Sequence, residues 1–367
     1  MKITEIEVTP FGVPIKKFAD AYTGFSVSNA VLVKIHTDEG YTGYGEACAW
    51  EPEFYGETLE SVSSTIEKYI APEITGEDPR NINRILSLID AKLARITCAK
   101  EGIDLALHDL LGKVLDVPVY MLLGGKFRDR IPVATEIGID TPENMVNDAL
   151  EVLKLGIKVI KIKGSDNHGL DVERVREVRK AVGNDIELRL DPNAAWDVNG
   201  TIRTMKLLED CHLQLLEQPI PGWDLKGMAH IRDHINIPLM ADESIWTPQD
   251  AIRISEYGAA DLLNIKIAKS CGLHLGKKIE YVSESLGLSC IAGTEIEPGF
   301  SSIAKLHFAA SMKIHPLASE FTEIHLLEKN ILSHDIEIVD GCVKVPDKPG
   351  LGVSLNEERF DECRYEK

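Results

Sequence analysis

The chain has 367 residues, of which 44% are hydrophobic and 27% are charged. This length exceeds what a single core usually supports, so we expect one large barrel with an appendage, or two domains. The 40 basic and 59 acidic residues give a formal net charge of −19, and the scattered basic residues argue against a nucleic-acid partner.

The N-terminal sequence MKITEIEVTPFGVPI alternates like a strand and lacks the apolar run and cleavage site of a secretory signal. No segment approaches the ~20 consecutive apolar residues of a membrane span. The seven cysteines are widely spaced without a CxxC pair, which argues against a disulfide framework or a cysteine zinc site. We therefore expect a cytoplasmic protein in a reducing environment, with no membrane partner.

Residues 1–125 are predicted to form an α+β capping domain. Residues 3–15 and 30–47 have the pattern of antiparallel strands, and the second range contains an Asp-Glu-Gly turn. Helical patterns follow at residues 60–74 and 99–115.

Residues 126–325 are predicted to form a barrel of alternating strands and helices. Thr141 and Pro142 suit the start of the first barrel helix, and Gly156 suits its end. The strand-like runs span residues 131–139, 159–164, 186–193, 213–219, 238–244, 261–269, 288–298 and 315–321. Such a succession of eight strands and intervening helices is typical of a (β/α)8-type barrel. The last segment, 326–367, is expected to return to the capping domain.

Charged and amide side chains stand at the ends of five successive predicted strands. In a barrel of this type the chemistry lies at the carboxyl ends of the strands, so these side chains are candidates for a shared site. Residues two apart along a strand point to the same face. In chain order, the strand-end residues are Lys161 and Lys163, Asp191 and Asn193, Glu217, Asp242, and Lys266.

The three carboxylates among them predict a divalent metal site. Asp191, Glu217 and Asp242 would repel one another if they converged without a cation. Hard oxygen ligands suit Mg²⁺, with Mn²⁺ as an alternative. A small carboxylate substrate is then expected to bridge the metal and a lysine.

The lysine pair in VIKIKG predicts a general base. At roughly 3.3 Å rise per residue, the Cβ atoms of Lys161 and Lys163 lie about 6.6 Å apart. With an effective dielectric of ~20, their repulsion is roughly 2.5 kcal/mol, or about 1.8 pKa units. We therefore expect one amine to be pushed toward neutrality, where it can accept a proton. The alternative is that both lysines extend into solvent.

Together these motifs resemble the muconate lactonizing enzyme subgroup of the enolase superfamily, also described as the mandelate racemase/muconate lactonizing enzyme family. The intervals between Asp191, Glu217, Asp242 and Lys266 are 26, 25 and 24 residues, which is similar to the spacing in that subgroup. The resemblance spans nearly the whole chain. It rests on KIK at 161–163, DPN at 191–193, EQP at 217–219, DES at 242–244 and NIK at 264–266, with support at 99–113, 120–126 and 349–352.

The resemblance implies an N-terminal cap on a modified TIM barrel of the (β/α)7β type. It implies that the three carboxylates bind Mg²⁺, that Lys163 and Lys266 are the acid/base pair, and that Lys161 tunes Lys163. The implied chemistry is removal of the proton α to a carboxylate, giving an enediolate.

Two loops of the cap and three acids of the barrel are candidates for substrate recognition. An aromatic lid is expected from residues 19–26 and 48–58, although its aromatic side chains could instead pack a domain interface. Acidic side chains near the ends of the seventh and eighth strands could bind a cationic amino group. The full set of substrate-binding candidates is Asn193, Tyr22, Phe25, Trp50, Tyr55, Glu295, Glu297 and Glu320.

The resemblance implies a Mg²⁺-dependent isomerase, for which we put a muconate cycloisomerase type first. The alternatives are a racemase or epimerase of amino-acid derivatives or dipeptides, and a carboxylate dehydratase similar to o-succinylbenzoate synthase. A Schiff-base aldolase would need one desolvated lysine and is disfavoured by the three acids. A non-enzymatic binding protein is disfavoured because every position of the motif is filled. We also expect a homo-oligomer, as is common for soluble enzymes.

Overall fold

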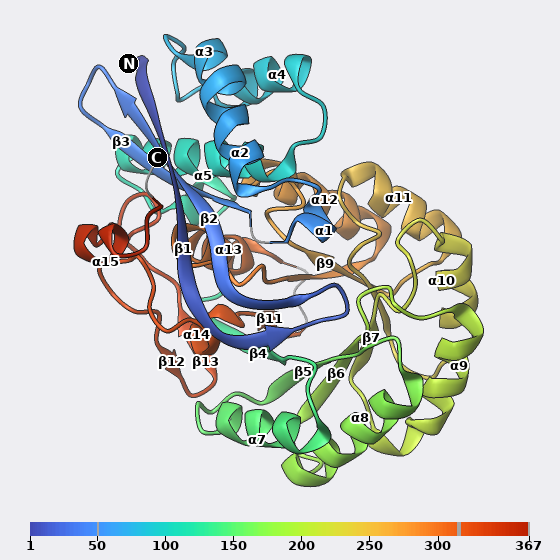
Figure 1. Cartoon of the computed structure of the whole chain (residues 1–367). Helices are drawn as coiled ribbons and strands as arrows, with labels where there is room; N and C mark the ends of the chain where they lie inside the picture. Colours follow the sequence, from blue (N-terminus) through green and yellow to red (C-terminus); the bar gives the residue numbers. More distant parts are fainter. Residues whose placement is uncertain (50, 314–316, 366–367) are drawn as a thin grey trace.

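The computed structural model describes residues 1–49, 51–313 and 317–365. A long, curved antiparallel sheet lies against a barrel, and helices form the outer ring of that barrel (Figure 1). Near the C-terminal end, the Tyr365 amide donates to the Pro10 carbonyl oxygen of the sheet at 3.0 Å. Within the described residues, no helix is long and apolar enough to cross a membrane.

The sheet of the capping domain consists of three antiparallel strands in the order β1, β2, β3. Gly40, in the predicted turn between β2 and β3, has a φ of +81°, which suits glycine. Helix α5 packs so closely on the sheet that a Cβ at Gly45 would lie 2.0 Å from the carbonyl oxygen of Gly102. The strands are β1 (Ile3–Ala19), β2 (Gly24–Thr37) and β3 (Thr42–Cys48).

The rest of the capping domain is helical, as predicted. Helix α2 begins with a capping box in which Thr58 and Ser61 exchange hydrogen bonds. The helices are α1 (Pro52–Tyr55), α2 (Leu59–Thr65), η1 (Ile66–Ile70), α3 (Ala71–Ile74), α4 (Ile82–Lys92), α5 (Thr97–Leu115) and α6 (Val119–Leu122).

The barrel strands are parallel and follow one another around the sheet from β4 to β10, and β11 returns to pair with β4. Between β10 and β11, the Ala292 amide donates to Ser319 Oγ at 3.1 Å. The strands are β4 (Arg130–Ile137), β5 (Val159–Lys163), β6 (Glu187–Asp191), β7 (Leu215–Glu217), β8 (Leu239–Ala241), β9 (Leu262–Ile265), β10 (Ser289–Ala292) and β11 (Ser319–Glu320). Residues 315 and 316 of the predicted eighth strand lie outside the described residues.

A helix follows each strand from β4 to β10, whereas β11 is followed only by the single turn α14 (Glu323–Leu326). This arrangement confirms the modified (β/α)7β barrel and its α+β cap. The helices are α7 (Pro142–Leu153), α8 (His168–Val182), α9 (Val198–Leu207) with η2 (Glu209–Cys211), α10 (Leu225–Arg232), α11 (Pro248–Tyr257), α12 (Leu273–Leu286) and α13 (Phe300–Ser311).

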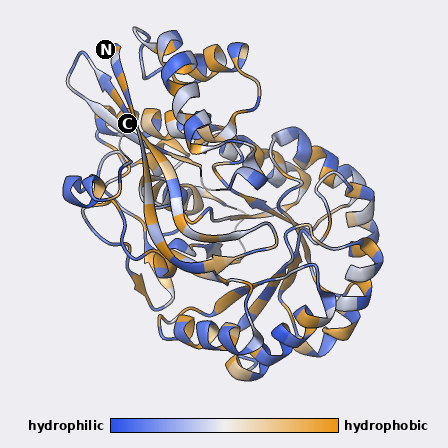
Figure 2. Ribbon diagram, in the orientation of Figure 1, coloured by the Kyte–Doolittle hydropathy of each residue, from blue (hydrophilic) through white to orange (hydrophobic). Residues whose placement is uncertain are grey.

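Helix α7 shows how the sequence pattern produces the outer ring. Thr141 Oγ1 accepts a hydrogen bond from the Asn144 amide at 3.3 Å, which caps the helix where predicted. Met145, Ala149 and Val152 are buried on one face. Hydrophobic and hydrophilic residues alternate along the ribbons of the outer helices (Figure 2), as expected for helices with one face on the core.

The C-terminal segment contacts both parts of the molecule. The hairpin of β12 (Ile338–Val339) and β13 (Cys342–Lys344) extends the barrel sheet, because β13 pairs antiparallel with β4. The chain then returns to the cap, as expected: α15 (Glu357–Asp361) brings the Phe360 ring to 5.4 Å from the Phe11 ring.

Candidate active site

The register of the barrel strands places the predicted strand-end side chains next to one another. Lys161 lies opposite Glu136 of β4 on one side and Arg189 of β6 on the other, and Lys163 lies opposite Asp191. The two lysines are 0% and 4% exposed. They are therefore buried in the barrel, and the alternative that they extend into solvent is wrong.

Lys161 is surrounded by carboxylates. Its Nζ atom lies 2.7 Å from Glu136, 2.9 Å from Glu320, 3.0 Å from Glu217 and 3.4 Å from Asp191. Two like charges can share one strand face because this acidic surrounding compensates both of them.

Lys163 has two of the same neighbours. Its Nζ atom lies 2.8 Å from Asp191 and 3.3 Å from Glu136. Burial lowers the pKa of Lys163, but Asp191 and Glu136 raise it by more, and repulsion from Lys161 is a smaller opposing effect. The pKa of Lys161 is likewise well above its ordinary value. The acids around the pair therefore outweigh the repulsion between the two amines, which the expectation of one near-neutral amine left out. That one of the amines serves as the base stays a prediction.

Lys266 follows β9 and faces the pair from the other side of the barrel mouth, since β6, β7 and β8 separate β5 from β9 in the sheet. Its Nζ atom lies 3.0 Å from Asp242 Oδ2 and 3.8 Å from Glu295 Oε1. The ring of Phe54, from the cap, lies 4.7 Å from the same ammonium. Lys266 and the pair on β5 thus border one space from opposite sides.

The three predicted metal ligands end or follow the neighbouring strands β6, β7 and β8. Burial raises the pKa of Glu217 well above its ordinary value; Lys161 opposes this effect, and Asp191, Glu320 and Asp242 add to it. These carboxylates therefore lie close enough to repel one another. In the structure lysine ammonium groups contact all three carboxylates, and Asn264 Nδ2 also donates to Glu217 Oε1 at 2.7 Å. Within residues 1–49, 51–313 and 317–365, no group of three His, Cys, Asp or Glu side chains is arranged to hold a metal ion.

The chemistry of this donor set nevertheless fits Mg²⁺. Three buried carboxylates on adjacent strand ends supply hard oxygen donors. Asp242 Oδ2 has no hydrogen-bond partner among the described residues, although it pairs with the Lys266 charge. The assignment of Asp191, Glu217 and Asp242 as ligands stays a prediction.

Three functional candidates at this site were missed from the sequence: Glu136, Lys269 and Glu243. Glu136 ends the first barrel strand and could have been found by the strand-end rule used for the others. Lys269 hydrogen-bonds both the carboxylate and the carbonyl oxygen of Asp242, the latter at 2.6 Å. This contact forms because the turn after β9 brings Lys269 back to Asp242. No strand or helix periodicity in the sequence predicts that turn.

Glu243 connects the barrel to the lid. Its Oε1 atom accepts hydrogen bonds from the Tyr22 hydroxyl at 3.0 Å and from Asn193 Nδ2 at 3.5 Å. Burial, followed by the charges of Asp242 and Asp191, raises the pKa of Glu243 to about 8. Tyr22 and Asn193 therefore lie next to Glu243, the residue after the predicted ligand Asp242, and their assignment to substrate binding stays a prediction.

An aromatic group covers this side of the barrel. The Phe54 ring lies 5.8 Å from Tyr22, 4.9 Å from Tyr55 and 5.6 Å from Trp246. The two cap loops thus meet the barrel through stacked and edge-on rings, and Trp246 is a member that the sequence analysis did not name.

Phe25 and Trp50 are the other two predicted lid residues. Phe25 packs against the hydrophobic core of the capping domain. Trp50 lies outside the described residues. Their assignment to the substrate site stays a prediction.

The three acids proposed for a cationic group have different surroundings. Glu320 is deep in the barrel, where Lys161 and Asn264 contact it at 2.9 and 3.2 Å. Glu297 pairs with Lys305 at 2.7 Å. The carboxylate of Glu295, in contrast, accepts no hydrogen bond from any residue that the structure describes.

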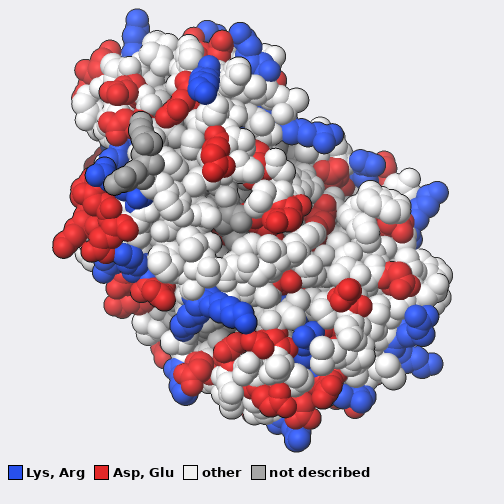
Figure 3. All heavy atoms as spheres, viewed as in Figure 1, with Lys and Arg blue, Asp and Glu red and all other residues white. Residues whose placement is uncertain are grey.

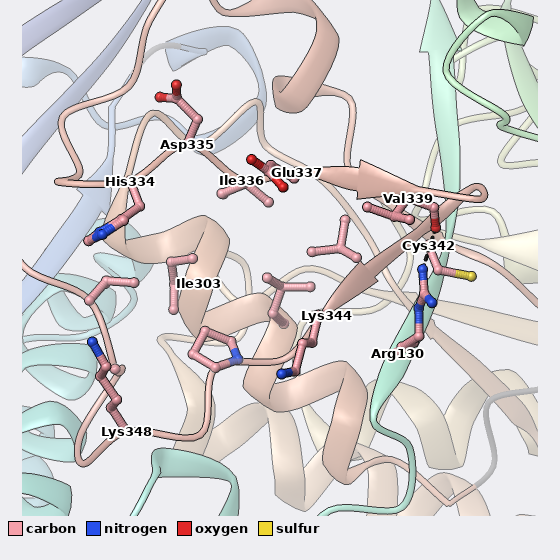
Figure 4. A pocket seen from close by; sticks show the side chains of 15 residues that line it. Arg130, Ile303, His334, Asp335, Ile336, Glu337, Val339, Cys342, Lys344 and Lys348 are labelled. Carbon is pink, nitrogen blue, oxygen red and sulfur yellow. Dashed lines mark hydrogen bonds between the residues drawn. The ribbon is translucent and has the colours of Figure 1, made fainter.

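A further pocket lies at the opposite end of the barrel. Its lining comes from α13, the C-terminal segment and Arg130, which begins β4 (Figure 4). Lysine and arginine side chains on the face of Figure 3 are interspersed with aspartate and glutamate. The candidate catalytic and metal-binding residues converge at the lysine-lined barrel mouth and not at this pocket.

Comparisons with known proteins agree with this assignment. The family model described as mandelate racemase / muconate lactonizing enzyme, N-terminal domain, matches residues 3–124. The model described as enolase C-terminal domain-like matches residues 144–359.

Several curated relatives align along nearly their whole length. L-Ala-D/L-Glu epimerase of Clostridium acetobutylicum is 37% identical over 96% of this chain and 99% of its own. N-succinyl-L-Arg/Lys racemase of Bacillus cereus is 34% identical over 99% of this chain and 98% of its own. Muconate cycloisomerase 1 of Rhodococcus opacus is 32% identical over 97% and 96%. These values favour the racemase or epimerase alternative over the cycloisomerase that the sequence analysis put first.

Solved structures show the same kinship. The crystal structure of the Bacillus cereus racemase superposes with a TM-score of 0.95 at 33% identity, covering 100% of this chain and 99% of that one. A dipeptide epimerase of Enterococcus faecalis, in complex with Mg and the dipeptide L-Leu-L-Tyr, superposes with a TM-score of 0.91 at 33% identity, covering 96% and 100%.

Proposed function

The chain belongs to the mandelate racemase/muconate lactonizing enzyme family of the enolase superfamily, and within that family we propose that it is a Mg²⁺-dependent racemase or epimerase of amino-acid derivatives. The substrate would be an N-acylated amino acid or a dipeptide with a free carboxylate. The observation that carries the proposal is the placement of Lys163 and Lys266, both buried, on opposite sides of one barrel mouth.

Inversion at the α-carbon needs a proton acceptor on one face and a proton donor on the other. Lys163 would remove or return the proton on one face, and Lys266 on the opposite face. When bound by Asp191, Glu217 and Asp242, Mg²⁺ would supply positive charge beside the substrate carboxylate and offset the acids that now raise both lysine pKa values.

Lys161 has a different role in this scheme. Because it contacts Glu136, Glu217 and Glu320 within 3.0 Å, it stays charged and does not serve as a base. It contributes fixed positive charge near the developing negative charge of the substrate. The ring of Phe54 over Lys266 would exclude water from the amine.

The comparisons support this reading, because the relatives with the higher identities are an epimerase and a racemase acting on amino-acid derivatives. Cycloisomerisation and dehydration would need a base on one face only. Enzymes of those kinds can nevertheless keep both lysines, so the preference for inversion depends on the comparisons as well as on the lysine pair.

The test is deuterium exchange in D2O followed by proton NMR, with N-acyl amino acids, dipeptides and muconates as substrates. We expect loss of the α-proton signal together with formation of the opposite configuration, and no exchange after treatment with EDTA. Lactone formation from muconate, without exchange in any amino-acid derivative, would instead establish the cycloisomerase.

A further inference from the structure

Glu295 is an unusual carboxylate for its surroundings. It is 1% exposed, and neither of its oxygens accepts a hydrogen bond from the residues that the structure describes. Lys266 is 3.8 Å away, which is too far for a hydrogen bond, and it is already held by Asp242 at 3.0 Å. Burial raises its pKa to about 7 and its polar neighbours, Lys266 and the Tyr55 hydroxyl, lower it, but neither gives it a hydrogen bond of normal geometry.

A second acid approaches the same space from the lid. Glu51 precedes α1 and is 5% exposed. Burial raises its pKa well above the ordinary value, and the charges of Asp20 and Glu295 raise it further, while Lys266 opposes them. Acidic side chains of the barrel and of both cap loops therefore surround the region above Lys266.

The ionisable groups at the barrel mouth include more acids than bases, which favours binding of a further cation. If all were ionised, the eight carboxyl groups among the described residues named there would exceed the five cationic groups by three charges. Burial raises the pKa of Glu295 to about 7 and that of Glu51 well above its ordinary value, so a nearby cation would favour their ionised forms. The carboxyl groups are Glu51, Glu136, Asp191, Glu217, Asp242, Glu243, Glu295 and Glu320, and the cationic groups are Lys161, Lys163, Arg189, Lys266 and Lys269. A substrate with a positive charge of its own would reduce the excess.

The position of these two acids indicates which part of the substrate they meet. The substrate carboxylate is expected beside the predicted metal ligands, at the ends of β6 to β8. Glu295 follows β10, and Glu51 lies in the lid next to Phe54 and Tyr55. The Tyr55 hydroxyl lies beside Glu295, since it lowers the pKa of Glu295, while burial and then Glu295 raise the pKa of Tyr55. A group held there belongs to the end of the substrate remote from its carboxylate.

We propose that Glu295 and Glu51 bind an ammonium or guanidinium group at the remote end of the substrate. This inference rests on the proposed function and narrows it to cationic amino-acid derivatives. The cation would donate to the free oxygens of Glu295, and α1 would bring Glu51 to it as the lid closes. The aromatic rings of Phe54 and Tyr55 would line the path of the connecting methylene chain.

The test compares matched substrates that differ in charge at one end. Nα-acyl-L-lysine carries the cation on its side chain, Nα-acyl-L-norleucine carries none, and L-alanyl-L-norleucine carries it at the N-terminus. The acyl group of both Nα-acyl substrates is the one that gives α-proton exchange in the deuterium screen described for the proposed function. We expect kcat/KM for exchange to be roughly 100-fold higher for a cationic substrate than for the neutral one. Whichever cationic substrate is preferred identifies the source of the charge.

Two variants separate recognition from folding. Glu295→Gln should bring the preference for the cation down to within a few-fold of unity, because kcat/KM falls far more for the charged derivative than for the norleucine derivative. Glu53→Gln, an exposed acid of the same lid helix, should leave the preference unchanged. Calorimetric binding of the lysine and norleucine derivatives provides a readout that does not need turnover.

The outcomes distinguish the two proposals. Equal kcat/KM and equal affinity for the charged and neutral derivatives, or a preference that survives Glu295→Gln, would overturn the cation site while exchange itself keeps the racemase. If no derivative exchanges, the proposed reaction fails. In that case, the cation site is still supported if the parent binds the charged derivative more tightly than the neutral one and Glu295→Gln loses this difference. If the parent shows no such difference in affinity, the cation site is overturned as well.

Discussion

Replacement of Lys161 by methionine should destabilise the protein in a pH-dependent way. At an effective dielectric of ~20, each pairing of the Lys161 ammonium with a carboxylate about 3 Å away is worth roughly 5–6 kcal/mol before the cost of burial. Glu136, Glu217 and Glu320 all lie within 3.0 Å of it. Because burial of the ions offsets much of that attraction, we expect a net loss of about 3–5 kcal/mol in the free energy of unfolding near pH 8.

The pH dependence follows from linkage. Without the ammonium, the folded-state pKa of at least one of these carboxylates rises above its unfolded value, so the folded variant binds an extra proton. The stability of the variant therefore falls as pH rises from about 5 to 8, and its deficit relative to the parent is smaller at pH 5.

The assay is urea unfolding at pH 5 and pH 8, followed by circular dichroism. Lys154→Met is the matched control, because Lys154 pairs with Glu151 on the surface, where its side chain is 66% exposed. That control should change the free energy of unfolding by less than about 1 kcal/mol at either pH. A Lys161→Met variant that loses under about 1 kcal/mol, or loses equally at both pH values, would refute the reasoning.

Two other changes test the carboxylates. Glu217→Gln should weaken Mg²⁺ binding by roughly tenfold or more in calorimetry, with the exposed Glu209→Gln as control, and equal affinity would exclude Glu217 as a ligand. Burial and Glu297 raise the pKa of Glu46 from 4.5 to about 8, even though Gly299 and Phe300 donate backbone hydrogen bonds to it. In the parent, this raised pKa lowers the free energy of unfolding by about 3 kcal/mol between pH 5 and 8. Glu46→Gln should abolish that part of the decrease, and identical pH profiles of parent and variant in denaturant titrations would contradict this.

The architecture and the superfamily could be predicted because they depend on local patterns. The strand ends fell at Lys163, Asp191 and Glu217 as the alternation predicts. The family resemblance is confirmed by matches that cover both domains. The ladder of β13 on β4 was not predicted, because it joins segments about 200 residues apart and has no local signal.

The electrostatics of the site could not be predicted from residue spacing. The two lysines were considered as an isolated pair, whereas the register adds Glu136 and the barrel closure adds Glu320. Likewise, Glu297 and Glu295 are two residues apart, yet Lys305 neutralises the first and leaves the second without a hydrogen bond within the described residues. Such differences depend on which distant element faces each side chain.

Whether the protein epimerises or cycloisomerises its substrate also depends on which distant elements face the site. A cycloisomerase and an epimerase can share every strand-end motif quoted from the sequence, since both begin by stabilising charge beside a carboxylate. What separates them is the substrate pocket, and its acids come from the lid and from the loops after β10 and β11.

The most direct test of the central claim is the stereochemistry of α-proton exchange in two single variants, Lys163→Ala and Lys266→Ala. Each purified variant is incubated in D2O with Mg²⁺ and, separately, with either configuration of a substrate found in the screen. Two lysines on opposite faces predict that each variant stops racemisation and exchanges only one configuration, and that the two variants retain opposite ones. Exchange of both configurations by either variant, or loss of the same configuration in both, would contradict the account.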